Sequence, residues 1–144
     1  MTIIVICGAG GTQPVETPDG VGVALANALA EDGNKVFCLR GMVEPWLEVA
    51  RVYLTFGFAD AGELSRQLEE LSRFEVIDAI VDVDQSCNLR QVRRFFPGTK
   101  VAAFLQGKHT ASLPGIEQLK ALLVRWMVGV PLSMADDFVG QGRA

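Results

Sequence analysis

Short apolar runs separated by segments of helical periodicity set the strongest limit on the fold of this chain. The runs are Ile3–Cys7, Lys35–Leu39, Ala79–Val83 and Lys100–Leu105. Continuous apolar runs of this length are typical of strands buried on both faces of a parallel sheet. Their alternation with helices predicts parallel β-α-β units with right-handed crossovers.

The helices are predicted from their starts and from apolar spacing. Thr17, Pro18 and Asp19 form a helix start, and Gly33 fits the end of a helix that runs to about Asp32. Asp60 and Glu63 have the spacing of a capping box. Further helices are expected over residues 64–71, 89–96 and after Pro114.

One segment stays open between two interpretations. Trp46, Val49 and Tyr53 keep helical spacing after Glu44-Pro45, yet Val52–Phe56 also fits a strand. We favour a short helix that runs into a strand.

Length and composition fit one domain over residues 1–144. The chain is 49% hydrophobic and 21% charged, which is enough to bury a large core. We therefore expect a three-layer α/β domain: an open parallel sheet of four to five strands with helices on both faces. Residues beyond about Asp137 are expected to be loosely ordered.

Charge and composition disfavour several classes of partner. The net charge is −4 and no Lys/Arg-rich block occurs, which disfavours nucleic acid. No apolar run reaches the roughly 20 residues of a membrane span. Three cysteines without C-x-x-C spacing and a single histidine argue against zinc or a disulfide framework, so we expect no metal and a cytoplasmic location.

The first strand leads into a glycine-rich loop. Gly8, Gly10, Gly11 and Thr12 follow it, where backbone N–H groups and a helix N-terminus can hold a phosphate. The dinucleotide fingerprint G-x-G-x-x-G places its third glycine at position 13, which is Gln13 here. Gly22 and the residues after it match the third glycine and first helix instead. The start of the chain thus resembles a Rossmann-like unit with about nine residues inserted in the loop.

Arg40 ends the second predicted strand. An acidic residue there holds the ribose hydroxyls of NAD, whereas an arginine accommodates the 2′-phosphate of NADP. NADP is therefore favoured over NAD. The alternative is a solvated arginine at a strand end.

Two later motifs strengthen a family resemblance. Gly57-Phe58-Ala59-Asp60 is a glycine–acidic turn, and Asp82 to Leu89 is an acidic loop that leads into Asn-Leu. These two motifs resemble those of the compact nucleotide-binding domain of potassium-transport regulators, the TrkA-N type. The resemblance implies the Rossmann-like fold and a binding edge that includes Asp84. The inserted loop, and Arg40 in place of the usual acid, depart from that family.

The same edge carries residues capable of other chemistry. Cys87 precedes a predicted helix, where a thiol pKa is lowered, and His109 is a candidate base. Asp82 and Asp84 could bind a metal, although such residues more often cap a helix and order a loop. Cys7 and Cys38 are expected in the core.

The sequence therefore predicts a nucleotide- or dinucleotide-binding domain with a regulatory or accessory role. The last helix is apolar on more than one face, which predicts a homo-oligomer formed through it; the alternative is packing within the chain. Two other functions stay open: an oligomeric accessory or structural subunit with a vestigial pocket, and a small cysteine-dependent enzyme that uses Cys87.

Overall fold

The computed structural model describes residues 1–7, 18–41, 52–83, 89–104, 113–130 and 138–143. Six strands and four helices occur in these ranges. The strands are β1 (Thr2–Cys7), β2 (Lys35–Gly41), β3 (Leu54–Phe58), β4 (Ala79–Val83), β5 (Lys100–Phe104) and β6 (Phe138–Arg143). The helices are α1 (Pro18–Glu31), α2 (Ala61–Phe74), α3 (Leu89–Phe95) and α4 (Leu113–Met127).

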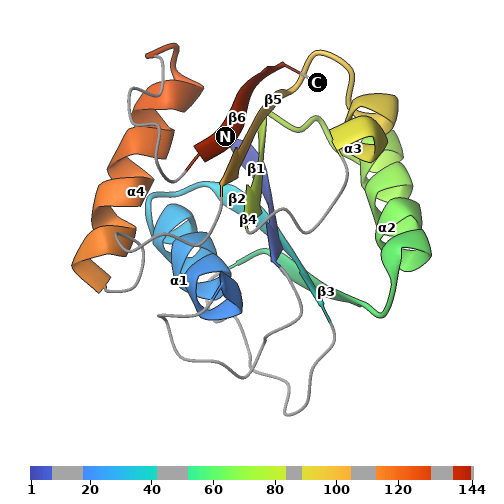
Figure 1. The fold of residues 1–144 in the computed structure, drawn as a ribbon, viewed down its shortest axis with the longest axis horizontal. Helices are drawn as coiled ribbons and strands as arrows, with labels where there is room; N and C mark the ends of the chain where they lie inside the picture. The colour runs from blue at the N-terminus through green and yellow to red at the C-terminus, as the bar shows by residue number, and fades with distance from the viewer. Residues whose placement is uncertain (8–17, 42–51, 84–88, 105–112, 131–137, 144) are drawn as a thin grey trace.

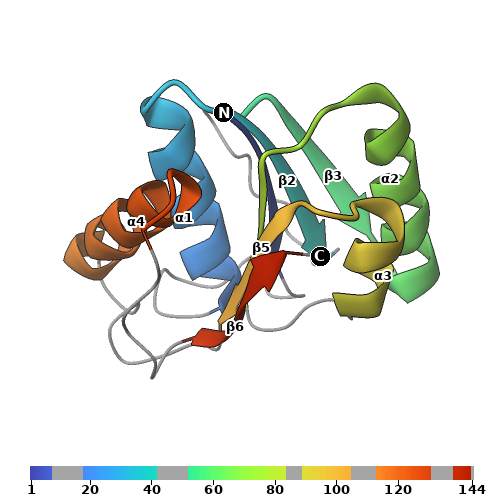
Figure 2. The same cartoon turned by 90° about the horizontal axis from the view of Figure 1, so that it is seen from above.

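The strands form one sheet in the order β3-β2-β1-β4-β5-β6. β1 to β5 are all parallel, and β6 pairs antiparallel with β5. Figures 1 and 2 show α1 and α4 on one face of the sheet and α2 and α3 on the other. The predicted α/β fold, an open parallel sheet of four to five strands with helices on both faces, is confirmed, with five parallel strands in the structure.

The side chains of each central strand alternate between the two faces of the sheet, and each face carries its own hydrophobic core. Ile3, Val5 and Cys7 of β1 belong to the core under α1 and α4. Ile4 and Ile6 belong to the core under α2 and α3. Because successive side chains of a strand point to opposite faces, a strand that is buried on both faces is mostly apolar.

The start of α2 is set by its first residues. The Asp60 carboxylate accepts a hydrogen bond of 2.8 Å from the backbone N–H of Glu63, as the capping-box spacing predicted. Glu63 accepts from the backbone N–H of Ala59 at 3.4 Å, one residue before the usual position. Leu64, Leu68 and Leu71 then bury one stripe of α2 against the sheet.

The strand expected in the ambiguous segment is confirmed, and the tail contains a strand that the sequence did not predict. The ambiguous segment is a strand from Leu54 to Phe58, whereas the helix expected before it lies outside the described residues. The tail, expected to be loosely ordered, includes β6. Its backbone pairs with β5, for example Gln141 with Ala102, so this strand arises from a contact distant in the sequence.

The apolar side chains on several faces of α4 pack against other parts of the same chain. Leu123, Trp126 and Met127 are buried in the core on the α1 side, and Leu122 and Val124 pack against that core. The Lys100 ammonium donates to the Trp126 carbonyl at 2.8 Å, at the C-terminus of the helix. This intramolecular packing accounts for the pattern that predicted an oligomer, and the homo-oligomer stays a prediction.

Candidate functional site at the carboxyl edge of the sheet

The carboxyl ends of β1, β2 and β4 meet at one edge of the sheet. Cys7 ends β1 and pairs with Arg40 of β2, and Ile6 pairs with Asp82 of β4. The chain leaves β1 for β2 on one side and reaches β4 on the other, so the strand order reverses between β1 and β4. In open α/β sheets, ligands bind beyond the carboxyl ends of the strands at such a reversal.

Gly22 brings α1 unusually close to this point. A Cβ atom on Gly22 would lie 2.3 Å from Cys7 Sγ and 3.0 Å from Cys7 Cβ, with Val83 Cγ2 at 3.7 Å. No side chain fits at such distances, so only glycine permits this approach. The first turns of α1 are thereby held over the junction of β1 and β4. Close packing of helix on strand is the role of the third glycine in a dinucleotide fingerprint.

Arg40 lies at the same edge and is completely buried, with 0% of its surface exposed. The alternative prediction, that Arg40 is a solvated arginine at a strand end, is therefore wrong. Its pairing with Cys7 puts it on the α1 face of the sheet, because paired residues of neighbouring strands share a face. A buried guanidinium requires charged or polar partners, and Arg40 is engaged in such an interaction in this structure.

Two further groups at this edge have different surroundings. Asp82 is buried and pairs with Ile6, so it lies on the α2 face, opposite to Arg40. Cys7 and Cys38 are buried in the core, as expected, with their Sγ atoms 3.9 Å apart. The sheet thus separates Arg40 from Asp82, and the two thiols lie on the side of Arg40.

Most of the predicted site residues lie outside the described part of the chain. They are Gly8, Gly10, Gly11, Thr12, Asp84, Cys87 and His109. Arg40 is the predicted binding residue whose position is described, and the roles of the others stay predictions. Within the described ranges, no three His, Cys, Asp or Glu residues gather as metal ligands would.

Comparison with known proteins yields no relative from which a role could be transferred. No model of a known protein family matches the chain, and the search of curated proteins finds no match. Among the described residues, no helix is both long and apolar enough to cross a membrane.

A cavity that the sequence reasoning missed lies between α2 and the strands β2 and β3. Its volume is about 190 Å³. Its polar lining residues, Gln67, Glu70 and Glu75, were not recognised from the sequence. The available signal was the place of Gln67 three residues after Leu64, where the apolar stripe of α2 would favour a hydrophobic side chain.

Proposed function

We propose that this protein binds a nucleotide or dinucleotide at the carboxyl edge of its sheet, with NADP favoured over NAD, in a regulatory or accessory role. The observation that carries the proposal is the contact between Gly22 and Cys7 beside the reversal of strand order. It holds the amino-terminal part of α1 where a pyrophosphate would meet backbone N–H groups.

Arg40 supports the choice of NADP. It lies at the end of β2, where this fold recognises the adenosine ribose, and it carries a positive charge there. Arg40 is buried and has an interaction partner in this structure, so a 2′-phosphate has to compete with that partner. A charge-assisted hydrogen bond in a water-poor site is stronger than one at the surface, which favours such an exchange.

The test is a thermal-shift titration against NADPH, NADH, FAD, ATP and AMP. A ligand that binds only the folded state at 100 times its Kd stabilises it by about 2.7 kcal/mol. For a domain of this size, that corresponds to a rise in Tm of about 8 °C. We expect NADPH to give the largest rise and NADH a smaller one.

The matched variant is Arg40→Met, which keeps most of the buried volume and removes the charge. We expect it to lose the preference for NADPH over NADH, whatever its own Tm. If no nucleotide raises the Tm of the wild-type protein, the proposed function is wrong. If NADPH binds and Arg40→Met retains the preference, the role of Arg40 is wrong.

A further inference from the structure

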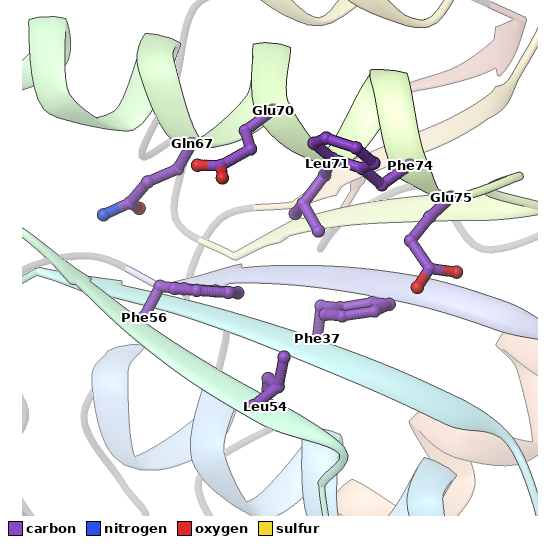
Figure 3. A pocket seen from close by; sticks show the side chains of 8 residues that line it. All are labelled: Phe37, Leu54, Phe56, Gln67, Glu70, Leu71, Phe74 and Glu75. Atoms are coloured by element: carbon purple, nitrogen blue, oxygen red, sulfur yellow. The ribbon is translucent and has the colours of Figure 1, made fainter.

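The cavity between α2 and the strands β2 and β3 lies on the α2 face of the sheet, whereas Arg40 and α1 lie on the opposite face. Phe37 is near the beginning of β2 and pairs with Leu54, the first residue of β3. Together with Phe56, they form the floor, on the α2 face of the sheet. Figure 3 shows Leu71 of α2, and Glu75 just after the helix, directed toward the strands across the cavity. The lining residues are Phe37, Leu54, Phe56, Gln67, Glu70, Leu71, Phe74 and Glu75.

The size and walls of the cavity suit one aromatic ring with a short chain. An apolar cavity of about 150 Å³ is large enough to hold benzene, and this one has about 190 Å³. Phe37 and Leu71 are buried walls, and Phe74 is 76% exposed at the rim. A ring inside the cavity would meet aromatic partners at the distances that favour edge-to-face or offset contacts.

Gln67 lines the cavity and carries a hydrogen-bond acceptor that no described residue satisfies. Its amide nitrogen donates to the carbonyl of Gly57 at 2.6 Å, which fixes the orientation of the amide. Its oxygen Oε1 is buried and accepts no hydrogen bond from any residue that the structure describes. Figure 3 shows this oxygen on the side of Glu70. A buried acceptor without a donor is costly, so a ligand that donates to it gains affinity.

The charged residues at the rim of the cavity favour a positively charged ligand. Glu75 is already paired with the Lys35 ammonium at 2.9 Å. Glu70 forms no ion pair with any of the described residues and lines the same cavity, one helical turn from Gln67. A cationic nitrogen can therefore donate to Gln67 Oε1 and face the Glu70 carboxylate at once.

We propose that this cavity binds a small aromatic amine, with the ring between Phe37, Phe56 and Leu71 and the protonated amino group on Gln67 and Glu70. The site is separate from the proposed nucleotide site because it lies on the α2 face of the sheet, and Arg40 and α1 lie on the other face. Binding of the amine therefore does not depend on binding of a nucleotide.

The probe is phenethylamine, which is added to the isotope-labelled protein while backbone amide resonances are followed. We expect saturable shifts at Phe37, Phe56 and Gln67. Two matched compounds separate the contributions of ring and charge. 3-Phenylpropionate has the same ring with the opposite charge, and butylamine has the charge without the ring. We expect both to bind at least about tenfold more weakly, since each lacks one of the two complementary parts.

Neighbouring glutamates provide matched variants. Glu70→Gln removes the carboxylate of the site, whereas Glu69→Gln removes one that pairs with Arg73. We expect Glu70→Gln to weaken phenethylamine roughly fivefold, as for a partly exposed ion pair, and Glu69→Gln to leave the affinity unchanged. Gln67→Met preserves the shape without the acceptor and should weaken binding about tenfold.

Four results would each overturn the proposal. They are the absence of saturable shifts at millimolar phenethylamine, equal binding of 3-phenylpropionate, equal effects of the two glutamate variants, and unchanged affinity in Gln67→Met. Loss of the NADPH-induced thermal shift alone bears on the carboxyl edge and not on this cavity, so the two proposals can fail separately.

Discussion

Replacing Gly22 with alanine tests whether the close approach of α1 to β1 depends on glycine. The new Cβ would lie 2.3 Å from Cys7 Sγ, well inside contact distance, and Cys38 Sγ limits the retreat of that sulfur at 3.9 Å. Forcing extra volume into a packed core costs about 1–3 kcal/mol. The upper part of this range applies because the sulfur is buried.

The higher helix propensity of alanine offsets part of this steric cost. In a helix it is favoured over glycine by about 1 kcal/mol. The net destabilisation expected for Gly22→Ala is therefore about 2 kcal/mol, or a fall of roughly 6 °C in Tm for a chain of this length. Chemical denaturation monitored by circular dichroism measures the free energy of unfolding directly.

The steric origin can be checked with a double-mutant cycle. Cys7→Ala removes the sulfur, so Gly22→Ala should cost at least about 1 kcal/mol less in that background. Gly62→Ala is the control, because its Cβ would meet only the Asp60 carboxylate, at 3.3 Å, on an exposed helix start. A Gly22→Ala protein as stable as wild type, or a cost unaffected by Cys7→Ala, would refute the reasoning.

Three other parts of the structure make testable predictions. Asp60→Ala should lower the free energy of unfolding by about 1 kcal/mol and Asp60→Asn by much less, in denaturant titrations, because the carboxylate caps α2. Hydrogen bonding to Glu117, with the charge of Asp32 adding to it, raises the pKa of Lys120 above 10.5. Its contribution to stability should be present below pH 10.5 and lost at higher pH, so the deficit of Lys120→Met measured across pH should vanish there. Cys7 and Cys38 are two residues out of register on neighbouring strands, which separates their Cα atoms by about 8 Å, too far for a disulfide. Mass spectrometry after mild oxidation should therefore find no peptide that links them.

The central strands could be predicted because their burial determines their composition. β4 reads Ala79–Val83 and is buried at every position, so its local sequence carries the signal of its place in the sheet. The leucine stripe of α2 is a similar case, since one face of that helix packs on the sheet. For these two elements, the apolar pattern predicted the type of element that the structure shows.

The outer strands could not be predicted in the same way. β3 is the outermost strand on its side and its residues are only half-buried or exposed, so its sequence also suits a helix. β6 contains Gly140 and Gly142, which are unfavourable in strands. Its conformation depends on backbone pairing with β5, which no local pattern reveals.

For Arg40, the sequence predicts the position in the fold but not the burial of the side chain. Its position could be predicted because a parallel strand that ends at residue 40 or 41 must end at the carboxyl edge. Its complete burial could not, because arginine is most often exposed and burial depends on what the α1 face packs against it. Topology follows from the apolar pattern, whereas the environment of a polar side chain follows from tertiary packing.

Gln67 breaks the apolar pattern of α2, and that conflict is informative. Leu64, Leu68 and Leu71 follow the spacing of a buried stripe, and Gln67 occupies a position on the same face. Local sequence rules are most often violated at functional sites, where the cost in stability is tolerated for another reason. If Gln67 only tied α2 to Gly57, Gln67→Met should destabilise the protein without changing any binding property. A loss of amine affinity in that variant would show instead that the acceptor is kept for a ligand.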